Sequence, residues 1–281
     1  MTNSDHAYRF IIDFKWWIMI IKGKKSILQR IVFELKYRYG FTYLDACGRT
    51  VNKIQKEYPE WILRGNEPNP QNAPLISMKN SCIFNFSALK LDLSLERPIG
   101  ERSLLQEDLD EFIDQFESLS AIVIDQLGLE IFTRIGFRAW HIFPCESEQD
   151  SEQWLLNLGL YSISEKVHTG FGGQIESAGV SIIILGEDRK FRIAFNGVER
   201  QAQIDFGQGL LNIPSRSLHK GQKEFLKKQL AIRGRMRQNP GFAAMIDIDC
   251  FIDDPEIVNP AQFVRTSIDQ YTNTLESIIK M

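Results

Sequence analysis

The chain has 281 residues, of which 43% are hydrophobic and 11% are aromatic, and its formal net charge is −3 at pH 7. This length and apolar content are enough to bury a sizeable core in one large domain or two modest ones, so we expect the chain to fold independently. The most apolar run, Trp16 to Ile21, falls far short of the roughly 18 residues that a membrane-spanning helix requires, and the composition predicts no membrane association.

The N-terminus and the cysteines both point to a reducing compartment. The first residues, MTNSDHAYRF, have neither the cationic start, the apolar stretch nor the cleavage site of a signal peptide, which predicts a cytoplasmic protein. Cys47, Cys82, Cys145 and Cys250 occur singly, without CxxC spacing. They are therefore interpreted as small core residues, and neither a zinc site nor any cofactor is expected.

The first third of the chain combines apolar segments with a polar linker. Residues 8–22 are dense in Phe, Ile and Trp, which favours a buried strand, with a buried helix as the alternative. Between Lys25 and Tyr39 the apolar residues recur at helical spacing, so an amphipathic helix ending at Gly40 is predicted. Residues 66–74 read NEPNPQNAP, and their three prolines predict a surface linker.

After this linker the apolar period changes to two. Strands are predicted at 74–78 and 82–86, joined in a hairpin by Lys79 and Asn80. Leu89, Leu91, Leu93 and Leu95 alternate with polar residues, which predicts a third strand with four leucines on one face. Ser103 is the predicted N-cap of a helix that continues towards Gly128, and a strand at 130–143 follows.

The last third repeats this arrangement. Strands are predicted at 179–185, 190–195 and 198–206, and Asn196-Gly197 is interpreted as a tight hairpin between the second and third. A further alternating strand is predicted at 241–252. Asn259 caps a closing helix that begins with Pro260, and its apolar stripe either covers the sheet of its own chain or pairs across a two-fold axis in a homo-oligomer.

These elements predict an α+β fold, in which antiparallel meanders and hairpins carry amphipathic helices on one face. Two similar α+β regions are expected. The first covers residues 1–150 and contains the linker near 66–74. The second covers residues 151–281 and contains the basic segment at 216–237 and the closing helix at 260–281.

Two strand motifs carry a resemblance to a known family. The stretches TRIGFRAWHIF, Thr133 to Phe143, and MIDIDCF, Met245 to Phe251, precede a terminal amphipathic helix. In this order they resemble a sporadically distributed family of uncharacterised bacterial proteins of about 250 to 280 residues, with a Gly-x-Arg-aromatic strand and an Asp-Ile-Asp strand. Trp140 departs from the Tyr-Asn pair that tends to follow the Arg in that family. The resemblance implies patchy occurrence, as for genes of mobile or defence loci, and no catalytic residues.

Two aspartates are the best candidates for metal chemistry. Asp247 and Asp249 are two apart on a predicted strand, so both carboxylates lie on one face, an arrangement that suits magnesium. The alternative is that they are the solvent-facing side of a strand whose other face is apolar, and no neighbouring Lys or His completes a site. This alternative is favoured. His141 is likewise interpreted as a half-buried sheet residue, not as a base.

Residues 216–237 form a basic segment with eight Lys and Arg against one acid, Glu224, and the rest of the chain carries −10. Such segregation favours an anionic partner, with a solvated helix or loop as the alternative. The residues expected to bind the partner are Lys220, Lys223, Lys227, Lys228, Arg233, Arg235 and Arg237. Only one aromatic residue, Phe225, lies among them, which argues against base stacking and makes a protein partner a better expectation than nucleic acid.

No catalytic signature occurs in the sequence. The functional prediction is therefore a non-catalytic binding or accessory protein that acts with an effector encoded by a neighbouring gene, in phage defence or a toxin–antitoxin system. A nucleic-acid-binding or metal-dependent nuclease subunit is the alternative. In that case, about five phosphate contacts by the basic segment would give a log-log salt slope of about −4 to −5.

Overall fold

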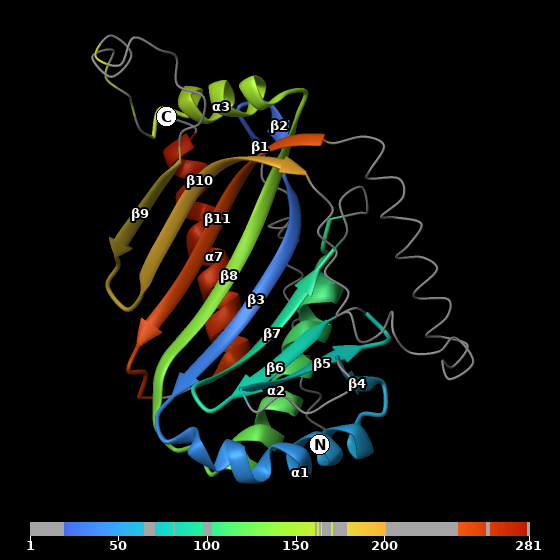
Figure 1. Cartoon of the computed structure of the whole chain (residues 1–281). Helices are drawn as coiled ribbons and strands as arrows, with labels where there is room; N and C mark the ends of the chain where they lie inside the picture. Colours follow the sequence, from blue (N-terminus) through green and yellow to red (C-terminus); the bar gives the residue numbers. More distant parts are fainter. Residues whose placement is uncertain are drawn as a thin grey trace, which may run out of the picture.

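The computed structural model describes residues 20–64, 71–80, 82–97, 103–160, 179–200, 241–256 and 259–279, together with residues 162, 164 and 170. Its central feature is a nine-stranded antiparallel sheet with the strand order β4-β5-β6-β7-β3-β8-β11-β10-β9 (Figure 1). The strands are β3 (Ile27–Tyr37), β4 (Trp61–Leu63), β5 (Asn72–Ser77), β6 (Ile83–Ser87), β7 (Lys90–Glu96), β8 (Phe132–Cys145), β9 (Val180–Leu185), β10 (Lys190–Arg200) and β11 (Gly241–Asp253). A separate hairpin pairs β1 (Ile20–Ile21) with β2 (Lys24–Lys25).

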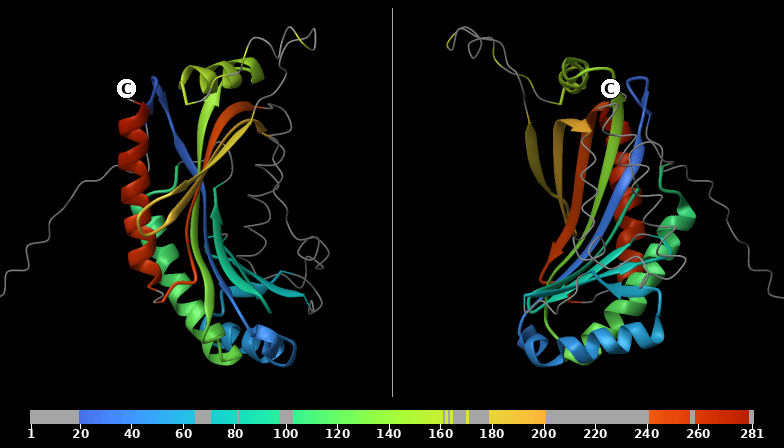
Figure 2. Two further views of the ribbon diagram at one scale, coloured as in Figure 1. Left: turned by 90° about the vertical axis from the view of Figure 1, so that its left-hand side faces the viewer. Right: turned by 45° about the vertical axis from the view of Figure 1, so that its right-hand side comes forward.

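Helices cover one face of this sheet. Figure 2 shows α2 (Gln106–Leu127) and α7 (Pro260–Ile279) on the same side of the strands, while α1 (Tyr43–Glu57) crosses one end of the molecule and α3 (Glu148–Asn157) the other. A short 3-10 helix, η1 (Gly40–Thr42), leads into α1. This combination confirms the predicted α+β class. Among the described residues, no helix has both the length and the apolar character that crossing a membrane requires.

The hydrophobic core lies between the sheet and this helix layer. At its centre, the ring of Phe33 on β3 packs edge-on against Phe116 of α2, with ring centroids 4.2 Å apart, and against Phe263 of α7 at 6.1 Å. The α7 stripe that includes Val264, Ile268 and Tyr271 is buried within the chain. The closing helix therefore covers its own sheet.

The segment from Lys25 to Tyr39 is a strand, so the predicted amphipathic helix is wrong. In β3, buried residues alternate with partly exposed ones from Val32 onwards, and Phe33, Leu35 and Tyr37 all face the helices. The apolar positions 28, 31, 32 and 35 fit a helical period by coincidence. Pairing with β7 on one side and β8 on the other decides the conformation, because tertiary pairing overrides local propensity.

Three other predicted boundaries also need correction. The Asn196-Gly197 pair is not a hairpin turn: β10 continues through it and pairs Asn196 with Met245 of β11. The linker predicted at 66–74 gives way to β5 from Asn72 onwards, and residues 66–70 lie outside the described part of the chain. Leu89 precedes β7 and occupies the turn between β6 and β7, so only three of the four leucines belong to the buried face of that strand.

Several other predictions are confirmed. Helix α2 ends at Gly128, whose φ of 62° is the left-handed conformation that glycine adopts without strain. The predicted N-cap Ser103 is wrong, however: the N-cap is Leu105, whose N–H donates to the Asp108 carboxylate at 2.9 Å. Asn259 caps α7 through the Gln262 N–H at 3.0 Å. The strands predicted at 130–143, 179–185 and 241–252 correspond to β8, β9 and β11.

The two regions predicted at 1–150 and 151–281 contribute to the same sheet. Strand β8 of the first region pairs along its length with β11 of the second, from Arg134 opposite Asp253 to Cys145 opposite Phe242. The first region supplies β3 to β8, and the second adds β9 to β11. Both regions thus contribute strands to one continuous sheet.

Candidate functional site

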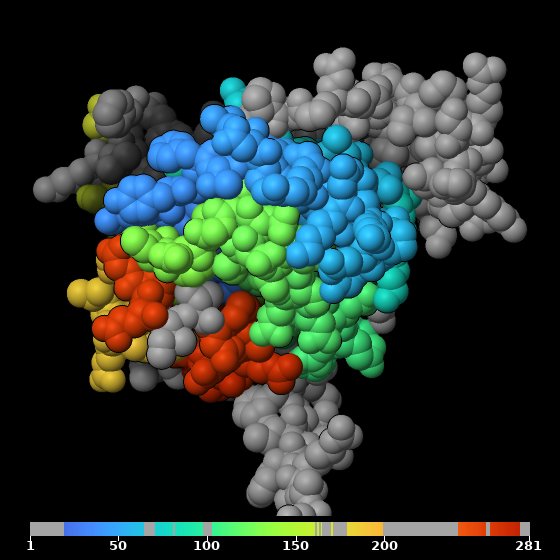
Figure 3. Space-filling view, turned by 90° about the horizontal axis from the view of Figure 1, so that it is seen from below, coloured from blue at the N-terminus to red at the C-terminus, as the bar shows by residue number. Residues whose placement is uncertain are grey.

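Five large apolar side chains lie exposed at one end of the sheet. Their exposed fractions range from 47% to 70%, and we call this group the apolar tip: Tyr39, Phe41, Leu44, Leu89 and Ile131. They come from the end of β3, the beginning of α1, the turn before β7 and the residue before β8. Seen from below in Figure 3, η1 and α1 in blue adjoin the start of β8 in light green and form one surface. Exposed apolar side chains gathered at one place on the surface are typical of protein interaction sites.

Backbone contacts hold the segments of the apolar tip together. The Tyr37 N–H donates to the Leu89 carbonyl at 3.0 Å, and the Arg38 N–H donates to the Ile131 carbonyl at 3.0 Å. The backbone at Gly40 comes so close to the turn before β7 that a Cβ there would lie 2.4 Å from the Ala88 carbonyl oxygen. Only glycine allows this approach, which fixes η1 against that turn.

Tyr39 adopts a conformation that a bulky side chain rarely takes. Its φ of 63° and ψ of 24° place it in the left-handed region. This conformation costs about 1 kcal/mol for a residue with a Cβ, and glycine would avoid that cost. The side chain is also 70% exposed, so core packing gives no reason for a tyrosine. A strained aromatic residue held towards solvent is therefore a candidate contact residue.

A pocket adjoins the apolar tip. It has a volume of about 470 Å³ and is lined by Arg38, Glu130, Ile131, Phe132, Asp254, Pro255 and Glu256. The Arg38 guanidinium lies 3.9 Å from the Asp254 carboxylate, and both groups are exposed. The pocket thus places charged groups beside the apolar side chains, as in interfaces with an apolar centre and a polar rim.

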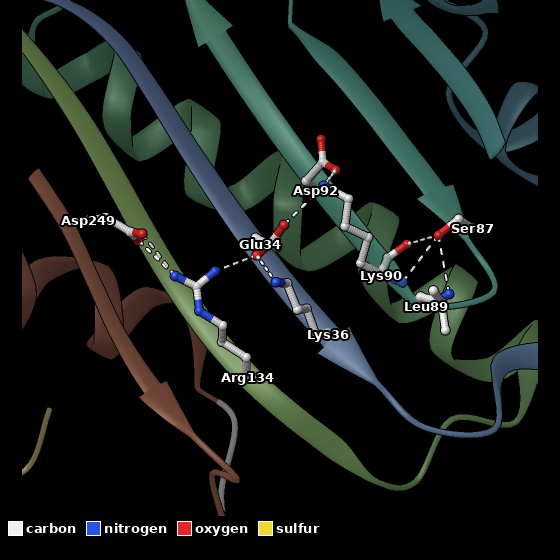
Figure 4. A network of polar contacts seen from close by, with 8 residues as sticks. All are labelled: Glu34, Lys36, Ser87, Leu89, Lys90, Asp92, Arg134 and Asp249. Atoms are coloured by element: carbon white, nitrogen blue, oxygen red, sulfur yellow. Dashed lines mark hydrogen bonds and ion pairs between the residues drawn. The ribbon is translucent and has the colours of Figure 1, made fainter. Parts of the chain in front are cut away.

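A network of ion pairs crosses the sheet next to the apolar tip, on the face opposite α2 and α7 (Figure 4). Glu34 accepts from Arg134 at 2.6 Å and from Lys90 at 3.0 Å. On the other side, one nitrogen of Arg134 donates to both carboxylate oxygens of Asp249 at 3.1 and 2.9 Å. Lys90 also pairs with Asp92 at 3.0 Å. The network ties together β7, β3, β8 and β11, and each of these strands has an end at the tip.

The charges in this network support one another. Burial would raise the pKa of the Glu34 carboxyl, but the hydrogen bond from Lys90 and the charges of Lys36 and Arg134 outweigh burial and lower that pKa below its ordinary value. Burial would lower the pKa of the Lys90 amine, but Asp92 and Glu34 raise it. Both groups therefore remain ionised at neutral pH, and the network holds the strand ends in place.

The turn that carries Leu89 is fixed by Ser87. The Ser87 hydroxyl accepts from the backbone N–H groups of Leu89 and Lys90, each at 3.2 Å, and donates to the Lys90 carbonyl at 3.1 Å. Figure 4 shows Leu89 beside Lys90 at the edge of the network. A side chain on a fixed turn loses less conformational freedom when it binds a partner.

Asp247 and Asp249, the candidate metal ligands, lie on the same face of β11, as the alternation predicts. They do not face open solvent, however: Asp247 is 4% and Asp249 8% exposed. Asp247 accepts from Nε of Arg138 at 2.7 Å and also pairs with its terminal nitrogen, and Asp249 is bound by Arg134. Within the described ranges, no group of three or more His, Cys, Asp and Glu residues is arranged to hold a metal ion.

The two motifs behind the family resemblance meet at this network, because β8 and β11 are neighbours. The Arg134 guanidinium carbon lies 4.5 Å from the Phe251 ring centroid. The Trp140 ring is approached by Arg30 at 4.5 Å and by Arg138 at 5.3 Å. The residues of the two motifs therefore contribute both ion pairs and cation–π contacts to this face of the sheet.

His141 is fully buried instead of half-buried. It faces the helix layer, where its Nε2 lies 3.3 Å from the Tyr271 hydroxyl of α7. Burial lowers the pKa of its imidazole to about 3, so the ring is neutral at physiological pH. A neutral histidine inside the core is a structural residue, and it has no access to a substrate.

The basic segment at 216–237, with its seven candidate binding residues Lys220, Lys223, Lys227, Lys228, Arg233, Arg235 and Arg237, lies outside the described residues. Its attachment points are described. Residues 201–240 connect β10 to β11, and Arg200 pairs with Gly241. This connection leaves and rejoins the sheet at the end opposite the apolar tip, because β11 reaches the tip at Asp253.

The apolar tip was not identified from the sequence. Exposed apolar residues resemble core residues in any pattern of hydrophobicity, and Leu89 even continues the alternation of β7. The available signal was local: Gly40 stands between two aromatic residues, Tyr39 and Phe41, and a glycine after an apolar segment is typical of a turn. Comparisons with protein-family models, with curated proteins and with solved structures found no match to this chain.

Proposed function

We propose that this protein is a non-catalytic binding protein that docks a protein partner on its apolar tip. The observation that carries the proposal is the group of five exposed apolar side chains on segments held together by backbone contacts. Two of them, Tyr39 and Phe41, are aromatic. Aromatic anchors on a rigid support, with charged groups around them, supply most of the binding free energy in protein interfaces.

The charged network serves a supporting role in this proposal. Its carboxylates are engaged by lysines and arginines of the same chain, so their charges are already compensated. Such a face offers little net attraction for a polyanion. A network that fixes four neighbouring strands would instead keep the apolar tip in one conformation, and a preorganised surface binds more tightly than a mobile one.

The expected partner is an effector encoded by a neighbouring gene, in a phage-defence or toxin–antitoxin system. This expectation rests on the lack of a catalytic signature in the sequence, on the segregated charge and on the patchy occurrence that the family resemblance implies. The basic segment would assist by attracting an acidic surface of that partner, since charges outside the interface centre mainly raise the association rate. Lys223, Lys227 and Lys228 are the residues that we expect to contribute to this attraction. The partner would therefore combine an apolar docking groove with an acidic surface.

The proposal predicts co-elution with the product of a neighbouring gene. The two proteins are co-expressed, and a tag on this chain is used to purify the complex at low and at high salt. Phe41→Asp together with Leu44→Asp is expected to abolish co-elution at both salt concentrations, because charged groups replace two adjacent apolar contacts. Lys223→Glu, Lys227→Glu and Lys228→Glu together are expected to slow association at low salt only.

A matched control is Ile20→Asp, because Ile20 is 66% exposed but lies on β1, at the end of the molecule opposite the apolar tip (Figure 1). This variant should co-elute like the unmodified chain. Failure to co-elute at any salt, or equal loss with Ile20→Asp, would contradict the proposal. Salt-sensitive retention of DNA or RNA that survives the tip variants and is lost with the three lysine substitutions would favour the nucleic-acid alternative.

A further inference from the structure

Strand β9 forms an uncharged outer edge of the sheet. It pairs with β10 on one side, and no described strand pairs with its other side (Figure 1). Its sequence, VSIIIL, contains no charged residue and no proline. Ile183 is 66% and Leu185 77% exposed. Edge strands are normally protected by charges, prolines, bulges or short length, so this edge is unusual.

The hydrogen-bond pattern shows which backbone groups of β9 point outwards. The Gly186 N–H donates to the Arg189 carbonyl at 2.9 Å, at the end of the β9–β10 hairpin. Because hydrogen-bonded and non-hydrogen-bonded pairs alternate in an antiparallel ladder, Ile184–Phe191 and Ile182–Ile193 are the next hydrogen-bonded pairs. The N–H and C=O groups of Ser181, Ile183 and Leu185 therefore face away from β10.

The β9–β10 hairpin is held rigidly in this position. Arg189 follows its turn and donates to the Thr266 hydroxyl at 2.9 Å and the Ser267 hydroxyl at 3.0 Å, both on α7. Its guanidinium carbon also lies 5.5 Å from the ring centroid of Phe263. The open edge is thus fixed to the core of the molecule, and a partner strand would meet a preformed template.

We propose that β9 pairs antiparallel with β9 of a second copy of this chain, across a two-fold axis at Ile183. In this register Ile183 faces Ile183 of the second copy, and Ser181 faces its Leu185, so every outward backbone group finds a partner. Glu187, the nearest charged residue, falls opposite Gly179 of the second copy. No like charges face each other, and the two sheets become one.

Self-pairing fits this edge because a two-fold interface must complement itself. The uncharged sequence meets that condition, whereas a partner of different sequence would normally be selected by charge or by specific pockets. The opposite edge of the sheet, β4, is only three residues long and offers a much smaller template. A six-residue strand pair buries little area, so we expect a weak dimer that dissociates on dilution.

The test measures the molar mass of the full chain by sedimentation or light scattering over a concentration series. A dimer is expected at high concentration. Ile183→Lys places two ammonium groups opposite each other, so it should raise the dissociation constant of the dimer at least about tenfold. Ile20→Lys is the matched control, since Ile20 is equally exposed at 66% but lies on β1, outside both the β9 edge and the apolar tip, and it should dimerise normally.

Disulfide trapping tests the register. Residues opposite each other in a hydrogen-bonded pair have Cα atoms about 5.5 Å apart, within disulfide range, so Ile183→Cys should give a covalent dimer on oxidation. Ile182→Cys should not, because diagonal positions are about 7–8 Å apart. The unmodified chain controls for its own cysteines. A monomer at every concentration, or a dimer that Ile183→Lys leaves intact, would overturn the proposal.

Discussion

Replacing Arg134 with alanine is expected to lower the free energy of unfolding by about 3 kcal/mol, because breaking a buried ion pair leaves uncompensated charges behind. Arg134 joins Glu34 to Asp249, and its side chain is only 18% exposed. Its removal leaves the Asp249 carboxylate with Arg192, a more distant partner at 3.5 Å. Urea denaturation at pH 7 measures the change.

Arg192→Ala provides the matched control for this prediction. Arg192 pairs with the same carboxylate, but its side chain is 38% exposed, so its removal should cost less than about 1 kcal/mol. If the network supports the apolar tip, Arg134→Ala should also accelerate hydrogen exchange at Tyr37 and Arg38, whose N–H groups bond to the tip. Equal losses of stability for the two arginine variants would contradict this account of the network.

The second large effect is a loss of stability in acid that we attribute to His141. Its folded-state pKa is lowered to about 3 by burial, whereas the unfolded chain has the ordinary value of 6.5. As the pH falls below 6.5, the unfolded state binds a proton that the folded state excludes, so stability decreases. The His141 contribution is complete above pH 6.5 and is lost towards pH 3. Between pH 7 and pH 4 this single group should cost about 3 kcal/mol of unfolding free energy.

A double variant isolates this contribution. His141→Phe combined with Tyr271→Phe removes both partners of the buried contact, which is nearly neutral when the replacements have a similar shape. Acid also protonates carboxylates such as Glu34, whose pKa is lowered in the folded state, and this destabilises both proteins. The difference between their curves of unfolding free energy against pH therefore reports on His141. The unmodified chain should lose more stability than the double variant below pH 6.5. If the two curves run parallel below pH 6.5, the claim that the His141 imidazole is buried in its neutral form is wrong.

Strict patterns allowed much of the fold to be predicted from the sequence. In β11, apolar and acidic residues alternate from Ile246 to Cys250, and α7 combines an N-cap, a proline at the first position and an apolar stripe. In these elements the local preference and the tertiary environment agree. The prediction of α2 succeeded for the same reason, down to its terminal glycine.

The sequence failed where local and tertiary preferences differ. Residues 27–37 satisfy a helical period as well as a strand period, and only pairing with β7 and β8 separates the two. The Asn196-Gly197 pair is a strong turn signal, yet β11 provides a partner for each residue and the strand continues. Turn chemistry is a local preference, and a long ladder of hydrogen bonds outweighs it.

The apolar tip was missed for a different physical reason. Leu89 and Ile131 are remote in sequence from the segment that contains Tyr39, Phe41 and Leu44, and they become its neighbours only through the strand order β7-β3-β8. Likewise, the two aspartates of β11 were placed correctly on one face, but the arginines that bury them come from β8, more than a hundred residues earlier. Composition and periodicity contain no information on such pairings.

The most direct test of the proposed docking surface is the affinity of Tyr39→Gly for the co-eluting partner. Glycine adopts the left-handed conformation of residue 39 freely, so the free energy of unfolding should stay constant or rise by up to about 1 kcal/mol. Partner affinity, measured by calorimetric titration, should fall at least about tenfold, because an aromatic anchor is lost. Unchanged affinity in this folded variant would contradict the assignment of the apolar tip as the docking surface.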